Sequence, residues 1–263
     1  MTERPLILLT NDDGVAAPGI NAMRAALAEV GDVVVAAPDR ERSAASHSIS
    51  LDRPLRVDEL EAGIFSVDGT PVDCVYLGLL HLVPRRPTLV VSGINNGYNL
   101  GSDVFYSGTV AGAVEGALRG VPALAVSLER RRLQDFSHAA RFAAALAAEL
   151  VRRGPAALPD ASLLSVNLPG GPVSGYRVTF LGRRVYRDQV EVRRDLRDRA
   201  YYWIGGPEEN ATDLPGSDLT AVRAGLASVT PLSLDLTHAR LIGELVDWRV
   251  GNFVHAAIER AKS

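Results

Sequence analysis

Residues 6–14 read LILLTNDDG. An apolar run that ends in Asn, Asp and Gly is typical of a buried strand followed by a turn. Residues 32–38 (DVVVAAP) and 87–94 (PTLVVSGI) have the same character. A stretch with apolar residues at helical spacing lies between the first two runs, over about 18–30. Buried strands that alternate with helices predict an α/β fold, a parallel sheet covered by helices on both faces.

The same alternation continues to about residue 170. Residues 70–73 (TPVD) predict a helix start, because a hydroxyl, a proline and an acid occupy the positions that they favour there. The remaining elements expected in this part are helices at 107–119 and 135–153 and strands at 122–128 and 162–168.

The character of the sequence changes near residue 170. The elements expected beyond it are antiparallel strands or an extended hairpin at 176–206, an acidic loop at 208–218, a strand at 227–235 and a terminal helix at 247–261. We therefore expect an α/β catalytic core over residues 1–170 and a β-rich extension over residues 171–263. Such an extension buries little of its own apolar surface, so we expect it to pack on a partner subunit.

The composition excludes several classes of protein. Of the 263 residues, 47% are apolar and 22% are charged, which excludes a disordered chain. Cys74 is the single cysteine, which excludes a disulfide framework and a cysteine zinc site. The net charge is −3, no apolar run reaches the ~18–20 residues of a membrane span, and the first residues lack a signal-peptide pattern. We expect a cytoplasmic protein that binds neither nucleic-acid polymers nor membranes.

The tetrad Asn11–Gly14 is the strongest candidate for chemistry. In open α/β sheets, ligands bind beyond the carboxyl ends of the strands. Adjacent carboxylates at Asp12 and Asp13 repel each other unless protons or a cation neutralise them, and oxygen ligands suit Mg²⁺ or Mn²⁺. The alternative is a plain polar turn. Polar loops at 39–48 and 92–99 follow two other expected strands and favour a shared site.

Residues 106–113 (YSGTVAGA) offer a second candidate, an anion site at the start of a helix. Free backbone N–H groups, two hydroxyls and the positive end of the helix dipole meet there. The alternative is ordinary helix capping. The sequence contains neither a Walker A motif nor a nucleophile-elbow Gly-x-Ser-x-Gly, and no Gly-x-Gly-x-x-Gly follows the first strand.

Five segments in this order and spacing resemble the SurE (survival protein E) family of metal-dependent nucleotidases. They are LLTNDDG (8–14), APDRERSAASHSIS (37–50), GTPVDCV (69–75), SGINNGYNLG (92–101) and YSGTVAGAVEGALRG (106–120). The resemblance implies a Rossmann-like core, a C-terminal segment exchanged between subunits, and homodimers or homotetramers. It also implies hydrolysis of nucleoside 5′- and 3′-monophosphates and, in some members, of short polyphosphate.

The resemblance further implies which residues act. It places one divalent ion, Mg²⁺ or Mn²⁺, on Asp12, Asp13, Ser43 and Asn95. It places the substrate phosphate on Asn99, Ser107, Gly108 and Thr109.

These assignments predict attack by a metal-activated water, with Asp12, Asp13 and Asn99 as catalytic residues and His47 as a proton shuttle. Taken alone, His47 reads as a surface histidine. A covalent aspartyl route through Asp12 is the alternative mechanism. A non-catalytic module that senses nucleotide or phosphate in the same crevice is the alternative function, and only turnover separates it from an enzyme.

Overall fold

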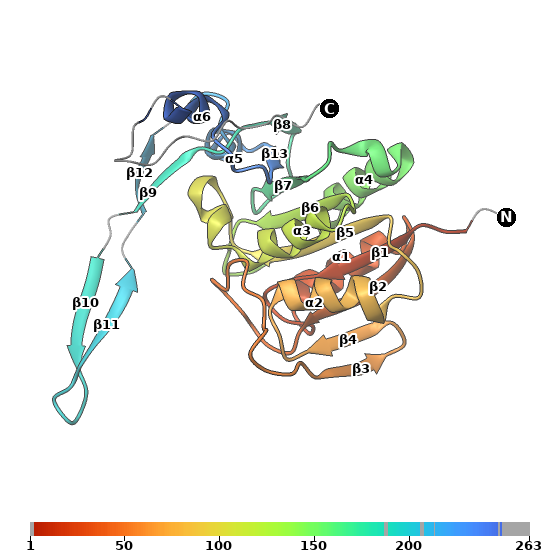
Figure 1. The fold of residues 1–263 in the computed structure, drawn as a ribbon, viewed down its shortest axis with the longest axis horizontal. Helices are drawn as coiled ribbons and strands as arrows, with labels where there is room; N and C mark the ends of the chain where they lie inside the picture. Colours follow the sequence, from red (N-terminus) through yellow and green to blue (C-terminus); the bar gives the residue numbers. More distant parts are fainter. Residues whose placement is uncertain (1–2, 187–188, 206–207, 213, 247, 249–263) are drawn as a thin grey trace.

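The computed structural model of the chain describes residues 3–186, 189–205, 208–212, 214–246 and 248. Its centre is a nine-stranded sheet in the order β3-β4-β2-β1-β5-β6-β7-β13-β8 (Figure 1). These strands are β1 (Leu6–Thr10), β2 (Asp32–Pro38), β3 (Val57–Glu61), β4 (Ile64–Val67), β5 (Leu89–Asn96), β6 (Ala123–Leu128), β7 (Ser162–Leu168), β8 (Tyr176–Val178) and β13 (Ala227–Ser233). Only the pairs β3–β4 and β7–β13 are antiparallel among the ladders of this sheet that the structure describes. The predicted α/β fold is confirmed.

Helices cover both faces of the sheet. The four that do so are α1 (Pro18–Leu27), α2 (Pro71–Leu77), α3 (Gly108–Leu118) and α4 (Ser137–Arg153). Side chains of β1 alternate between two cores: Ile7 and Leu9 pack with α1 and α4, whereas Leu6 and Leu8 pack with α2 and α3. The first four residues of this strand are therefore all apolar, because both of its faces are buried.

The order of the strands locates a crevice beside β1. From β1 the chain first adds β2 and β4 on one side, and it later adds β5, β6 and β7 on the other. The connections at the carboxyl ends of β1 and β5 consequently diverge, and ligands bind at such a switch point in doubly wound sheets.

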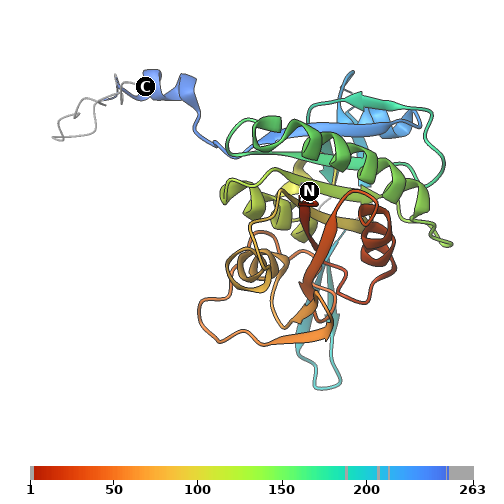
Figure 2. The same ribbon diagram turned by 90° about the vertical axis from the view of Figure 1, so that its right-hand side faces the viewer.

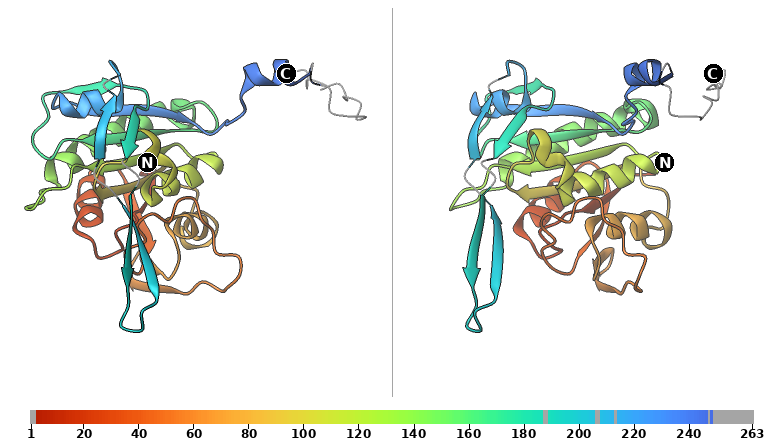
Figure 3. Two further views of the ribbon diagram at one scale, coloured as in Figure 1. Left: turned by 90° about the vertical axis from the view of Figure 1, so that its left-hand side faces the viewer. Right: turned by 60° about the vertical axis from the view of Figure 1, so that its left-hand side comes forward.

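Two antiparallel ribbons lie outside the main sheet. In one, β9 (Arg183–Tyr186) pairs with β12 (Glu208–Thr212); in the other, β10 (Gln189–Arg194) pairs with β11 (Ala200–Gly205). The β10–β11 hairpin projects away from the main sheet (Figure 3). The prediction of a loop over 208–218 is wrong, because β12 forms its first part. This strand pairs with β9, whose paired residues lie 22 or more positions earlier in the sequence.

The predicted boundary at 170 falls just after β7. Beyond it, β8 and β13 join the same sheet as the core, while β9 to β12 form the ribbons. Helix α5 (Asp218–Arg223) precedes β13, and helix α6 (Ala239–Val246), absent from the sequence prediction, lies apart from the main sheet (Figure 2). The predicted terminal helix over 247–261 lies outside the described residues, apart from residue 248.

Local signals explain where several elements begin and end. At the start of α2, the Thr70 hydroxyl accepts the Asp73 N–H at 3.1 Å and Asp73 accepts the Thr70 N–H at 2.9 Å, the reciprocal capping box that residues 70–73 predict. Short helical turns are η1 (Gly78–Leu82), η2 (Gly101–Phe105) and η3 (Pro155–Ala157). Among the described residues, no helix has the length and apolar character that crossing a bilayer requires.

Candidate active site

Asp12 follows the end of β1 by two residues and packs against the first turn of α3. Its side chain is buried, with 5% of the residue exposed. The Thr109 hydroxyl donates a hydrogen bond to Asp12 Oδ1. A Cβ added to Gly108 would lie 2.9 Å from Asp12 Cβ and 3.0 Å from Asp12 Oδ2. Glycine at this position therefore lets the start of the helix approach the carboxylate.

The second carboxylate, Asp13, faces the end of β5. The backbone N–H of Asn96 donates to Asp13 Oδ2 at 3.1 Å. The Asn95 Nδ2 donates to the Gly97 carbonyl at 2.9 Å, which leaves the Asn95 amide oxygen available as an acceptor. Asn96 Oδ1 is buried and has no partner. Two side-chain amide oxygens at the end of β5 thus accept no hydrogen bond among the described contacts.

Burial dominates the electrostatics of this pair. It raises the pKa of Asp12 from 3.8 to about 6, against hydrogen bonding from Thr109 and with a contribution from the neighbouring Asp13 carboxylate. The pKa of Asp13 is raised as well, first by burial and then by the charge of Glu41, while the Asn96 N–H and Arg130 oppose the rise. Two adjacent acids that resist ionisation are the expected signature of a site lacking positive charge.

The loop after β2 brings Ser43 towards the same strand end. The Arg42 N–H donates to the Asp12 carbonyl at 2.7 Å, which ties the loop to the backbone of the tetrad. Ser43 is exposed, and its hydroxyl donates to Glu41 Oε1 at 2.6 Å. Its oxygen lone pairs remain available to a further ligand.

Ser107 is the N-cap of α3. Its hydroxyl accepts the Val110 N–H at 3.0 Å. Helix capping, the alternative interpretation of the YSGTVAGA segment, therefore applies to Ser107. Gly108 and Thr109 instead lie against Asp12. Capping does not exclude anion binding, because the other N–H groups of a first helical turn have no partners inside the helix.

Asn99 belongs to a buried amide network. Its side-chain Nδ2 donates to Ser127 Oγ at 2.8 Å. Its backbone N–H donates to Asn167 Oδ1 at 2.8 Å, and Asn167 Nδ2 donates to the Asn99 carbonyl at 3.0 Å. The network joins β6 and β7 to the segment that leads into η2.

His47 contacts Glu115, which lies two helical turns along α3 from Gly108. His47 Nε2 is 3.4 Å from Glu115 Oε2, and Arg119 Nε donates to Glu115 Oε1 at 2.8 Å. Although burial alone would raise it, the pKa of Glu115 is lowered by its hydrogen bonds with His47 and Arg119. Among the hydrogen bonds and ion pairs of the described residues, none joins His47 to Asp12 or Asp13.

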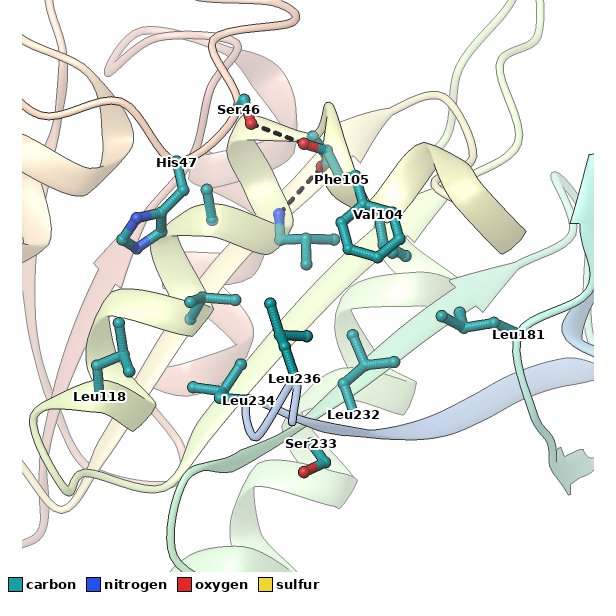
Figure 4. A pocket seen from close by; sticks show the side chains of 14 residues that line it. Ser46, His47, Val104, Phe105, Leu118, Leu181, Leu232, Ser233, Leu234 and Leu236 are labelled. Carbon is teal, nitrogen blue, oxygen red and sulfur yellow. Dashed lines mark hydrogen bonds between the residues drawn. The ribbon is translucent and has the colours of Figure 1, made fainter. Parts of the chain in front are cut away.

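A cavity of about 400 Å³ opens beside His47, between α3 and residues 232–236. Figure 4 shows that leucine and valine side chains line this cavity and that His47 lies at one side of it. Ser46, next to His47, donates its hydroxyl to the Phe105 carbonyl at 2.6 Å (Figure 4). The 43–48 loop is thereby fastened to the residues just before Ser107.

The donor set fits a hard divalent cation. Within the described part of the chain, no group of three or more His, Cys, Asp or Glu side chains comes together, so the two carboxylates would need neutral oxygen ligands beside them. Ser43 and Asn95 are of that kind, and the orphaned acceptor Asn96 Oδ1 adds a further oxygen. All-oxygen sites suit Mg²⁺ or Mn²⁺ rather than zinc or copper.

Four residues of the site were not singled out from the sequence: Glu41, Asn96, Glu115 and Arg130. Glu41 and Asn96 lie inside the polar loops at 39–48 and 92–99. The sequence indicated these loops but not the contacts of Glu41 with Ser43 and of Asn96 with Asp13. The signal for Arg130 was the run of three arginines, 130–132, directly after a strand.

Comparisons with known proteins show which family the chain resembles. The family model described as Survival protein SurE matches residues 7–188. A protein of Anaeromyxobacter dehalogenans named 5′-nucleotidase SurE is 55% identical over 250 residues, which cover 94% of this chain and 97% of that one. Its counterpart of the same name in Myxococcus xanthus is 50% identical over 257 residues, or 96% and 97% of the two chains.

A solved structure leads to the same family. The crystal structure of the SurE protein from Aquifex aeolicus matches with a TM-score of 0.82 and 40% identity, and the match covers 92% of this chain and 98% of that one. These matches show that the chain, with its Asp12–Asp13 pair at the switch point of the sheet, belongs to the SurE family.

Proposed function

We propose that this chain is a 5′-nucleotidase that hydrolyses nucleoside monophosphates to nucleoside and phosphate in the crevice at the ends of β1 and β5. The observation that carries the proposal is the Asp12–Asp13 pair at the end of β1, in which Asp12 is buried against the glycine-initiated first turn of α3 and Asp13 is half-buried. The relatives that match nearly the whole chain are named 5′-nucleotidase SurE. We extend the proposal to 3′-monophosphates and short polyphosphate, whose phosphoryl groups present the same oxygens.

The proposed cofactor is one Mg²⁺ or Mn²⁺ per subunit, held by Asp12, Asp13, Ser43 and Asn95. When bound, the ion would serve as a Lewis acid for the phosphoryl oxygens and would lower the pKa of a nearby water. The chain's own contribution is to keep Asp12 in place through the Thr109 hydroxyl and Asp13 in place through the Asn96 N–H. Because the pKa of Asp12 is about 6 without a cation, the site is ready to bind one at neutral pH.

The substrate phosphate would lie at the start of α3. Backbone N–H groups of Gly108 and Thr109 and the positive end of the helix dipole favour its oxygens and the charge that moves onto them in the transition state. The Ser107 N–H already donates to the Asp103 carbonyl at 3.1 Å, so Ser107 would contribute through its hydroxyl. Asn99, held by Ser127 and Asn167, would add an amide at this position. His47 would carry a proton through Nδ1, because its Nε2 faces Glu115.

We further propose that the protein works as a homodimer or homotetramer. In the β10–β11 hairpin, the cross-strand pairs Val190–Ile204 and Val192–Tyr202 lie on one face, and all four residues are exposed. A two-stranded hairpin is marginally stable alone in water. A partner subunit would cover this apolar face.

A phosphatase assay tests the proposal. The full-length protein is assayed on p-nitrophenyl phosphate and on a panel of nucleoside 5′- and 3′-monophosphates, with Mg²⁺, with Mn²⁺ and with EDTA. We expect metal-dependent release of phosphate. Nucleotide binding without turnover would support a sensing module instead, and a hydroxylamine-sensitive phosphoenzyme would support the aspartyl route through Asp12.

A further inference from the structure

Arg130 lies at the same edge of the sheet as the acid pair. It follows the end of β6 by two residues, and β6 pairs with β5, so that Asn96 lies opposite Leu128. Arg130 Nε donates to the Asn96 carbonyl at 2.9 Å. The N–H of the same residue, Asn96, donates to Asp13. One residue therefore links the guanidinium to a carboxylate of the candidate metal site.

Among the described contacts, Arg130 is held by a backbone carbonyl and not by a carboxylate. Its side chain is exposed, and no carboxylate of the described residues lies within ion-pairing distance of it. Asn96 joins it to Asp13, so its positive charge lies close to that carboxylate. The arginines of the neighbouring loop differ, because Arg40 and Arg42 both contact Asp39 at 3.1 Å.

The two carboxylates offset the charge of the proposed divalent ion, so a phosphate in this crevice gains from a cation supplied by the protein. A phosphate monoester carries close to two negative charges at neutral pH, and here it would approach two carboxylates and Glu41. The proposed phosphate-binding groups of Asn99 and residues 107–109 are all neutral. An arginine whose Nε is already fixed keeps its two Nη groups as a planar fork, which matches the spacing of phosphate oxygens.

We propose that Arg130 binds the phosphate group of the substrate at the rim of the crevice. This inference rests on the proposed nucleotidase function and adds a residue to it. Arg130 would supply the protein's positive charge to an anionic substrate and would remain fixed by the Asn96 carbonyl. It would at the same time oppose the binding of a cation, since its charge acts on Asp13.

The neighbouring arginines provide the control. Arg131 contacts Glu129 at 3.0 Å, and Glu129 also accepts the Gly170 N–H, so Arg131 is part of the local structure. Arg132 is exposed, two residues beyond Arg130. Arg132→Gln removes the same charge from the same loop without touching Asn96, which makes it the matched control for Arg130→Gln.

Two measurements with opposite expected directions test the role. In the full-length protein, Arg130→Gln should raise KM for a nucleoside 5′-monophosphate and Ki for inorganic phosphate about 10-fold, the effect of losing one charge-assisted hydrogen bond. The Kd for Mn²⁺, measured by calorimetry, should fall about 2- to 5-fold, as expected when an exposed like charge is removed. Both changes should shrink in high salt, and Arg132→Gln should produce neither.

Other results would overturn the inference. If Arg130→Gln leaves KM, Ki and the Kd for Mn²⁺ unchanged, as Arg132→Gln should, then Arg130 does not bind the substrate phosphate. If Mn²⁺ binds more weakly and phosphate affinity is unchanged, Arg130 only braces Asn96 and the metal site. Failure of the proposed function is distinguishable, because the wild type would then release no phosphate from any nucleotide, whereas calorimetry with inorganic phosphate would still report on Arg130.

Discussion

Replacing Asp12 by Asn should stabilise the metal-free protein at neutral pH even though it removes a proposed metal ligand. Burial raises the pKa of Asp12 from 3.8 to about 6. Each pKa unit corresponds to about 1.4 kcal/mol, so the ionised side chain costs the folded state about 3 kcal/mol above pH 6. Asn carries no charge, and its amide oxygen can still accept the Thr109 hydroxyl.

The stabilisation should depend on pH in a defined direction. Below pH 3.8, Asp12 is protonated in both the folded and the unfolded chain, so the charge costs nothing there. As the pH rises from about 4 to about 6, the unfolded chain loses its proton first and the folded state loses stability. The difference in unfolding free energy between the variant and the wild type should increase over this pH interval and stay constant above it.

Chemical denaturation in EDTA, at about pH 4 and about pH 7.5, measures the effect. Adding Mn²⁺ should then favour the wild type, because ligand binding stabilises only the protein that binds it. Asp218→Asn is the matched control: Asp218 is also buried, but it accepts the N–H groups of Gly101, Gly182 and Leu219. That control should lose about 1–3 kcal/mol. Equal destabilisation by both substitutions would refute the reasoning.

Three further outcomes are expected. Gly108→Ala should lower kcat/KM for a nucleoside monophosphate at least about 30-fold, since a displaced transition-state donor costs ~10²–10³, with a melting shift of a few degrees. Gly243→Ala in α6, where an added Cβ meets nothing within 4 Å, should leave kcat/KM unchanged. Glu115→Gln should destabilise the protein by about 1–3 kcal/mol at neutral pH, and the loss should disappear as the pH falls through the lowered pKa of Glu115; an equal loss at low pH would contradict this. Light scattering of the full-length protein should give the mass of two or four chains, which a soluble monomer would disprove, and truncation after residue 225 should yield monomers or aggregates because it removes β13.

The sequence was most informative where each residue's neighbours in the chain decide its structure. The strand bounds Leu6–Thr10, Asp32–Pro38 and Ser162–Leu168 agree with the sequence prediction, because strands buried on both faces form short, mostly apolar runs. The capping box at Thr70 is likewise a local pattern. Its four partner groups lie within four consecutive residues.

Contacts between distant segments could not be read in this way. Strand β12 contains Glu208–Thr212, whose polar residues read as a loop until β9 supplies a partner. The contact between His47 and Glu115 joins two motifs that were each recognised alone. Arg130 could not be singled out for the same reason, because its neighbours in the sequence do not indicate that its side chain contacts Asn96 at the end of β5.

The packing of α3 explains why burial and charge meet at Asp12. Glycines recur every four residues on the side of this helix that faces the sheet, and a Cβ at each would be too close to its neighbour: 2.9 Å from Asp12 Cβ at Gly108, 2.9 Å from Ser92 Oγ at Gly112 and 2.8 Å from Val90 Cβ at Gly116. The helix therefore lies directly on the strand ends and excludes water from Asp12. Excluding water raises the pKa of Asp12, and the same exclusion strengthens the attraction of the acid pair for a cation. Small residues in the helix would thus contribute to the affinity of the proposed site, whose ligands they do not supply.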